Sequence, residues 1–195
     1  MTSPTPPAHY TAGVGDASGY AAFTAAQKTA ARQVLDLIDD VADITFTDLG
    51  DSNTGQILFG RNGNTGGAAA YAYFPSEFSQ NGGVVWIDKD LYTSSDLAPG
   101  ERGFSTFIHE FCHALGLKHS FAADNGVDTA NGLNFPDHGV LGAQDNNKYS
   151  VMSYTAHPKG SWVDIAPDGM SATKYNIEPS TPLLYDIAAL QYLYG

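Results

Sequence analysis

The stretch HEFCHALGLKH, residues 109–119, places three of the chain's six histidines and one glutamate within eleven residues. On an α-helix, His109 and His113 lie one turn apart on the same side, so both imidazoles can reach one ion. Gly116 stands where a residue free to adopt a positive φ ends the helix and turns the chain. His119 can then return to the same ion. The spacing therefore predicts a helix that ends in a three-histidine metal site.

Glu110 follows the first of these histidines. It is rotated from His109 by about 100° around the helix, too far for a third ligand, but it can lean over a metal-bound water as a general base. Three neutral histidines leave one tetrahedral position of zinc open to water, as in catalytic rather than structural sites. For HExxH alone the alternative is a surface helix with two solvated histidines, which the added Gly116 and His119 disfavour.

Composition sets limits on the partners of the chain. Its 195 residues, 43% of them hydrophobic, are enough for one sizeable core and few for two full domains. A net charge of −12 argues against binding to nucleic acid or to an anionic membrane. We find no apolar run of about 18 residues, so we expect no membrane-spanning helix. The Pro-rich start MTSPTPPAHY lacks the pattern of a secretory signal peptide, and we interpret residues 1–20 as a flexible leader.

Hydrophobic periodicity predicts an α+β fold with a twisted mixed sheet, because helices and strands do not alternate strictly. We expect a helix from Ala25 to about Asp40 and a motif helix that begins near Glu101 or Ser105 and ends at Gly116. A C-terminal helix follows Thr181 as N-cap and Pro182 in its first turn. Short β-branched and aromatic runs predict strands at 44–49, 55–60, 68–75 and 82–88.

Other polar groups have simpler interpretations. Cys112, the only cysteine, excludes an internal disulfide. Its place in the motif leaves a metal ligand or a reactive thiol open, but we favour a small buried thiol because three better ligands are present. Calcium binding in the 120–148 loop is also left open, yet a solvated loop is favoured because no EF-hand spacing occurs. The acidic residues of this loop are Asp124, Asp128, Asp137 and Asp145. We interpret His138 and His157 as surface histidines, with a contact to substrate as the alternative.

HEFCHALGLKH resembles the zinc-binding consensus of the metzincin metallopeptidases. Downstream, SVMSY at 150–154 resembles their methionine turn, with Met152 as the apolar floor beneath the zinc. Further stretches are similar to the serralysin family and occur in its order: FTAAQ to DDVADITFTD, AYAYFP, GGVVWID and LLYDIAALQYLYG. The resemblance covers roughly residues 20–195, with the 120–148 loop matching least.

The resemblance implies roles for individual residues. His109, His113 and His119 would bind zinc and Glu110 would be the base. Tyr154, two residues after the turn methionine, would ligate the zinc and swing away to stabilise the tetrahedral intermediate, where a phenol donor is physically sensible. The implied fold is one two-lobed domain over 1–195, with an N-terminal lobe at 21–119 and a C-terminal lobe at 120–195.

The family also implies how a protein or peptide substrate binds, as an extended strand added to a sheet edge. The run AAAYAYFP is the candidate edge, with Ala70, Tyr71, Ala72 and Tyr73 beside the substrate; a plain buried strand is the alternative. We expect an extracellular monomer, and the family leaves room for a protein inhibitor. Two departures stand out: no calcium-binding glycine–aspartate repeat domain is present, and Ser120 stands where members often have proline.

These observations predict a zinc-dependent endopeptidase. One alternative is a zinc-stabilised binding module without turnover, against which Glu110 and Tyr154 count because binding needs neither. A second alternative is a narrowly selective processing protease, which the sequence hardly separates from a broad one, since specificity resides in the shape of the pocket.

Overall fold

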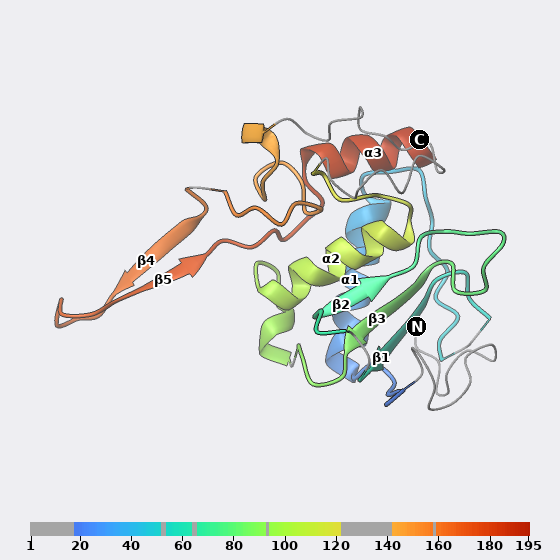
Figure 1. The fold of residues 1–195 in the computed structure, drawn as a ribbon, viewed down its shortest axis with the longest axis horizontal. Coiled ribbons are helices and arrows are strands. Elements are labelled where there is room, and N and C mark those ends of the chain that lie inside the picture. The colour runs from blue at the N-terminus through green and yellow to red at the C-terminus, as the bar shows by residue number, and fades with distance from the viewer. Residues whose placement is uncertain (1–17, 52–53, 64–65, 93, 122–141, 158) are drawn as a thin grey trace.

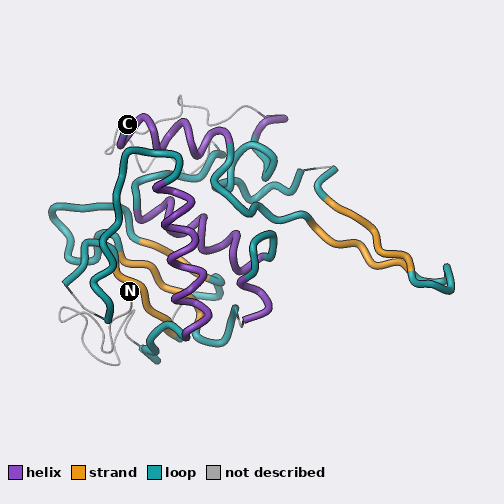
Figure 2. The backbone as a smooth tube through the Cα atoms, turned by 180° about the vertical axis from the view of Figure 1, so that it is seen from behind, coloured by secondary structure: helices purple, strands orange, loops and turns teal. Residues whose placement is uncertain are grey.

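The computed structural model describes residues 18–51, 54–63, 66–92, 94–121, 142–157 and 159–195. In this part of the chain a three-stranded mixed sheet packs with two helices, and a third helix closes the C-terminal end (Figure 1). The predicted α+β class and mixed sheet are confirmed. A two-stranded ribbon, formed by β4 (Ser161–Ile165) and β5 (Ala172–Asn176), projects from this body in both Figure 1 and Figure 2. No helix among the described residues is long and apolar enough to cross a membrane.

Helix α1 (Ala25–Asp39) agrees with its prediction to within one residue. It begins with a capping box, in which Thr24 Oγ1 accepts a hydrogen bond from Gln27 N and Gln27 Oε1 accepts one from Thr24 N. Apolar side chains three and four positions apart form its buried stripe, namely Ala30, Ala31, Val34, Leu35 and Ile38. This stripe fixes which face of α1 turns toward the core.

The sheet has the order β1-β3-β2. Central strand β3 (Val84–Asp88) runs parallel to β1 (Leu58–Asn62) and antiparallel to β2 (Ala70–Ala72). The first four residues of β3 are buried, as expected for a strand covered on both faces. β2 is thereby an edge strand, which is where the sequence placed the AAAYAYFP run.

Helix α2 (Arg102–Ala114) carries the histidine motif and is buried over almost its whole length. Stacked rings fix its rotation: the ring centroids of Phe107 and Phe111 lie 5.9 Å apart, and Phe111 lies 4.5 Å from Phe59 of β1. Such aromatic contacts stabilise a packing beyond the area that they bury. The direction in which the α2 histidines point is therefore set by the core.

Gly60 in β1 is a point of close packing. A Cβ atom added there would lie 2.6 Å from Cζ3 of the fully buried Trp86 and 3.1 Å from Tyr20. We therefore expect Gly60→Ala to lower the free energy of unfolding by roughly 1–3 kcal/mol. Urea unfolding checks this, with Gly63→Ala as control because the nearest atom there is on the flexible Lys89 side chain. An equal loss in both variants would contradict the packing explanation.

Four local predictions are wrong. Residues 44–49 form no strand, although Ile44 and Phe46 are half-buried and pack against the core. Strand β1 also starts three residues later than predicted and β2 is shorter. Helix α3 (Leu184–Tyr194) begins after Leu183 rather than after Thr181, because Asp186 Oδ2 accepts a hydrogen bond from Leu183 N.

Candidate metal centre and active site

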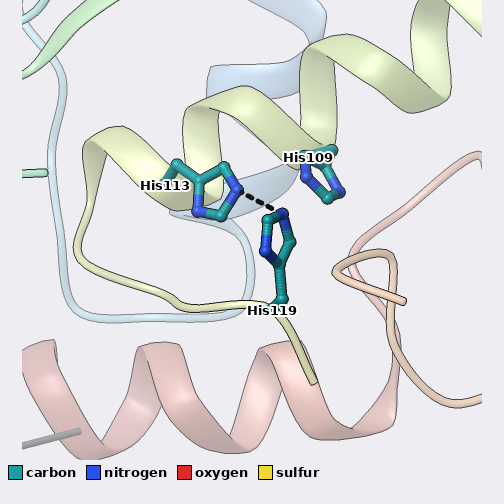
Figure 3. Close-up of side chains that lie close together, drawn as sticks. All are labelled: His109, His113 and His119. Carbon is teal, nitrogen blue, oxygen red and sulfur yellow. Dashed lines mark hydrogen bonds between the residues drawn. The ribbon is translucent and has the colours of Figure 1, made fainter. Parts of the chain in front are cut away.

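Three histidines converge at the end of α2 (Figure 3). One metal-binding nitrogen from each of His109, His113 and His119 lies within 4.8 Å of the others, the only such group among the described residues. Helix α2 ends at Ala114, and Gly116, with a φ of 100°, turns the chain back just beyond it. His119 Nε2 consequently lies 3.1 Å from His113 Nε2. The structure brings together the three ligands that the sequence predicted.

Backbone carbonyls hold the remote nitrogens of two of these rings. His109 Nδ1 lies 2.8 Å from Val151 O, and His113 Nδ1 lies 2.7 Å from Leu117 O. Because a carbonyl oxygen only accepts, each Nδ1 carries the proton and each Nε2 keeps its lone pair for the site. This arrangement is the one found around metal-binding histidines, so the donor set fits a cation.

Burial keeps these imidazoles neutral. It is the main cause that lowers the pKa of His109 to about 4, while the bond to Val151 opposes the shift and the charge of His119 adds to it. Burial also lowers the pKa of His113 well below its usual value, with further contributions from His109 and His119. Metal binding requires neutral imidazole, so both rings are in the binding form at neutral pH without losing a proton.

Glu110 is a buried carboxyl group, only 6% exposed. Its Oε2 has no hydrogen-bond partner among the described residues. Burial raises the pKa of Glu110 to about 8. An orphaned acceptor in a dry place is costly, and such groups are typical of sites that hold a proton or a water for chemistry.

Because the Glu110 carboxyl group is buried, we expect the stability of the metal-free chain to depend on pH. Its folded pKa of about 8 exceeds the ordinary value of 4.5, so the parent loses stability as pH rises from 4.5 through 8. Gln does not titrate, so we expect Glu110→Gln to be more stable than the parent by on the order of 3 kcal/mol near pH 8, and equal to it below pH 4.5. Urea unfolding in a chelator measures the difference, with exposed Glu77→Gln as control. A difference that does not change with pH would contradict the assignment.

The turn after the central loop lies against the histidines. Val151 supplies the carbonyl that holds His109, and Met152, 1% exposed, packs in the core. Tyr154 is 70% exposed, and its hydroxyl lies 2.8 Å from His119 Nε2. The two residues that the resemblance singled out therefore occupy different places, Met152 in the core and Tyr154 at the metal-facing nitrogen.

Two aromatic residues beside the histidines were missed from the sequence. Phe121 stacks on the His119 ring, with centroids 4.8 Å apart and planes 11° apart, and lies 5.1 Å from the Tyr154 ring. Phe74, which directly follows the predicted substrate residues, meets His113 edge to face with ring centroids 5.4 Å apart. The only indication in the sequence that either residue lies at the site was its position close to a predicted site residue.

The predicted substrate edge leads toward the metal site. Ala70, Tyr71 and Ala72 form the edge strand β2, and Tyr73 extends it through hydrogen bonds with Val84 O and Gly83 N. Since Ala69 and Tyr73 bond to β3, the alternation of a strand turns the backbone groups of Ala70 and Ala72 to the open edge. Phe74 then connects this edge to His113.

Asp186 in the first turn of α3 was also missed. It is 1% exposed and accepts hydrogen bonds from Ser150 Oγ at 2.6 Å, Val151 N at 2.8 Å and Leu183 N at 2.8 Å. Burial raises the pKa of Asp186, and these bonds oppose the shift. A single aspartate thus joins the C-terminal helix to the turn that holds His109.

The remaining candidates stay apart from the histidines or outside the described residues. Cys112 is fully buried in the core, and burial raises the pKa of its thiol. Asp145 accepts a hydrogen bond from Ser120 Oγ at 2.7 Å, and His157 Nδ1 accepts one from Lys159 N. His138 and the other loop aspartates, Asp124, Asp128 and Asp137, lie outside the described residues.

Known proteins are similar to this chain over most of its length. Residues 18–126, more than half of the chain, match the matrixin peptidase family. A serralysin from Photorhabdus sp. (strain Az29) is 34% identical over 182 residues, which covers 91% of this chain and 35% of that protein. The metallopeptidase AprA of Pseudomonas marginalis is 33% identical over 183 residues, covering 91% and 36%. Serralysin C of Dickeya chrysanthemi is 31% identical over 186 residues, covering 91% and 35%.

The chain spans about a third of the length of these relatives. The matched family and the three-histidine donor set together indicate zinc as the metal, as expected from the sequence. The matched segment contains the whole motif, and the relatives cover almost all of the chain. The resemblance drawn from HEFCHALGLKH is thereby confirmed, and the chain belongs to the matrixin peptidase family as a serralysin-like metzincin catalytic domain.

Proposed function

We propose that this chain is the catalytic domain of a zinc endopeptidase that hydrolyses peptide bonds of proteins. The observation that carries the proposal is the convergence of three histidines, next in sequence to a buried carboxyl group whose Oε2 has no hydrogen-bond partner among the described residues. A structural zinc site needs four protein ligands and no base. Three nitrogens and an orphaned Glu110 are the composition of a hydrolytic site instead.

In this proposal each side chain has a separate task. Zinc, when bound, supplies a Lewis acid that polarises the scissile carbonyl and makes water nucleophilic at neutral pH. A bound cation would lower the pKa of Glu110 and ionise it, and the carboxylate would then accept the proton of the attacking water and pass it to the leaving amine. The Tyr154 hydroxyl, which reaches His119 Nε2, is placed to donate a hydrogen bond to the developing oxyanion. Met152 anchors its turn in the core.

We also propose the path of the substrate. An extended peptide would add to the open edge of β2 beside Ala70, Tyr71, Ala72 and Tyr73, with backbone hydrogen bonds as the main contacts. Such binding recognises the backbone of the peptide more than its side chains. We therefore expect many unrelated substrates to bind. The resemblance also leads us to propose an extracellular location, a division into two lobes at residue 119 and a protein inhibitor. For the acidic residues of the 120–148 loop, a solvated loop stays favoured over calcium binding.

The test is hydrolysis of a panel of unrelated unfolded proteins by the zinc-loaded chain. We expect cleavage of several of them, loss of cleavage in a chelator, and recovery when zinc returns. The matched variant is His113→Ala, which should lose both the stoichiometric zinc and the cleavage. Cleavage of one panel member alone would favour a selective processing protease. A folded, zinc-loaded chain that cleaves none would favour the binding module and contradict the proposal.

A further inference from the structure

The three metal-binding histidines differ in what fixes their rings. His109 and His113 project from α2, whereas His119 projects from the irregular segment beyond it (Figure 3). The two helical side chains are 8% and 7% exposed, and each Nδ1 hydrogen-bonds to a backbone carbonyl. A metal ligand keeps its geometry only where packing fixes its rotamer. For the third ring, such packing has to come from its own segment and from the turn beside it.

Ser120, the residue after the third histidine, anchors this segment to the neighbouring turn. It is 1% exposed, its Oγ donates a hydrogen bond to Asp145 Oδ1 at 2.7 Å, and its N–H donates one to Met152 O at 3.4 Å. The rings of His119 and Phe121, on either side of Ser120 in the sequence, face each other. The backbone between the two rings is therefore tied down by the buried serine.

The rings of His119 and Phe121 form an offset stack. Their centroids lie 4.8 Å apart and their planes are 11° apart, which is an arrangement that aromatic rings favour. A parallel neighbour limits rotation of the imidazole about its Cβ–Cγ bond, because a turned ring loses the stacked contact and brings its edge toward the phenyl face. The stack therefore keeps His119 Nε2 where the structure places it, 3.1 Å from His113 Nε2.

Phe121 also contacts the tyrosine beside the metal-binding nitrogens. The ring centroids of Phe121 and Tyr154 lie 5.1 Å apart, and the Tyr154 ring lies 4.6 Å from the His119 ring. The three rings thus contact one another pairwise. Because the Tyr154 hydroxyl lies 2.8 Å from His119 Nε2, this group of rings lies directly at the metal-facing nitrogen.

An aromatic ring at position 121 stabilises the metal-bound state more than the metal-free state. A cation held by His119 draws electrons from the imidazole, and an electron-poor ring is attracted to the negative face of a phenyl group. The stack also fixes the rotamer of His119 before the cation arrives, which lowers the entropy lost on binding. A leucine side chain has neither a flat face nor this charge distribution. The contribution of Phe121 is therefore expected in metal affinity and not only in stability.

We propose that Phe121 is a positioning residue for the metal-binding ring of His119. It acts through the histidine and is not itself a metal ligand. The inference concerns the metal site alone, so it holds whether or not the chain hydrolyses peptides. Neither the spacing of the histidines nor the family resemblance assigned a role to this residue.

Competition with a fluorescent chelator measures the zinc affinity of the parent and of three variants. We expect Phe121→Leu to bind zinc about three- to tenfold more weakly, which is the range that one aromatic contact supplies. Phe121→Tyr keeps the ring and should bind zinc as the parent does. The control is Tyr175→Leu, since Tyr175 stacks on Trp162 in the ribbon, with centroids 4.5 Å apart and planes 18° apart. It loses a stacked ring away from the histidines and should keep the parent affinity.

Two spectroscopic measurements separate positioning from a general loosening of the segment. The visible absorption of Co²⁺ bound in place of zinc depends on the geometry of its ligands. We expect this spectrum to change in Phe121→Leu and to be recovered in Phe121→Tyr. Nuclear Overhauser contacts between the ring protons of His119 and Phe121 in the zinc-loaded parent test the stack without any substitution.

Equal zinc affinity in the parent and in a folded Phe121→Leu would overturn the proposal, and so would the absence of Overhauser contacts between the two rings. An equal loss of affinity in Phe121→Tyr would show that the aromatic face is not what matters, and an equal loss in Tyr175→Leu would show that the effect is not local. If Phe121→Leu keeps its zinc affinity but raises KM for a peptide, Phe121 contacts substrate, and the positioning role is likewise rejected.

Discussion

Glu110→Gln is expected to lower the rate of peptide hydrolysis by about a hundredfold to ten-thousandfold while the chain still binds one zinc. Gln keeps the shape of the side chain but cannot accept and return a proton. Because His109, His113 and His119 are unchanged, metal binding should persist, and the loss should appear in kcat rather than in KM. The measurement is steady-state hydrolysis of an unfolded protein and of a peptide, with zinc measured in the same samples.

The control for this experiment is Glu77→Gln, which removes an exposed carboxylate far along the chain from the motif. It should retain the parent rate. Equal hydrolysis by parent and Glu110→Gln would point to a contaminating protease and contradict the role of the carboxyl group as base. A loss of zinc in Glu110→Gln would instead show that the buried carboxyl group supports the metal site.

Asp186→Ala is expected to have the largest effect on stability, a loss of about 3–5 kcal/mol in the free energy of unfolding. The change leaves three donors without their acceptor, namely Ser150 Oγ, Val151 N and Leu183 N. Asp186→Asn keeps one acceptor oxygen and should lose less. Urea unfolding of the zinc-loaded chain measures both, with exposed Asp39→Ala expected within about 0.5 kcal/mol of the parent.

The same variant has a second expected readout. Val151 donates its N–H to Asp186 and offers its carbonyl to His109 Nδ1, so a displaced Val151 would reorient the first zinc ligand. We therefore expect Asp186→Ala to bind zinc about ten- to a hundredfold more weakly. Competition with a fluorescent chelator checks this, without urea and at a pH at which the variant is folded. Unchanged affinity would confine Asp186 to a purely structural role.

Local patterns in the sequence were sufficient to predict the helices and the convergence of the histidines. The stripe of α1 and the HExxH spacing of α2 depend on residues within one or two turns, which periodicity reads directly. Residues 44–49 show the limit of this reasoning, because a strand also needs a neighbour with which to pair. Ile44 and Phe46 pack against the core, but the segment pairs with no strand among the described residues, and no local pattern reports this.

Contacts between distant segments could not be predicted from the sequence for the same reason. Asp186 contacts Val151 across 35 residues of sequence, and Phe74 contacts His113, which lies on another element. Tyr154 was found only through the family resemblance, since as one of eleven tyrosines it had no distinguishing local pattern. The ribbon at 161–177 passed unnoticed because its apolar residues are spaced as in many loops.

The hydrogen bonds around Val151 have a consequence for the time at which the site forms. His109 is oriented by a residue 42 positions later, and that residue is held by Asp186, near the end of the chain. Tyr194 Oη also donates to Leu115 O, next to the turn at Gly116. A growing chain on the ribosome therefore holds the motif long before it holds the residues that align it. We therefore expect tight metal capture only once α3 is present, so a chain that stops before α3 would carry the HExxH sequence without an assembled centre.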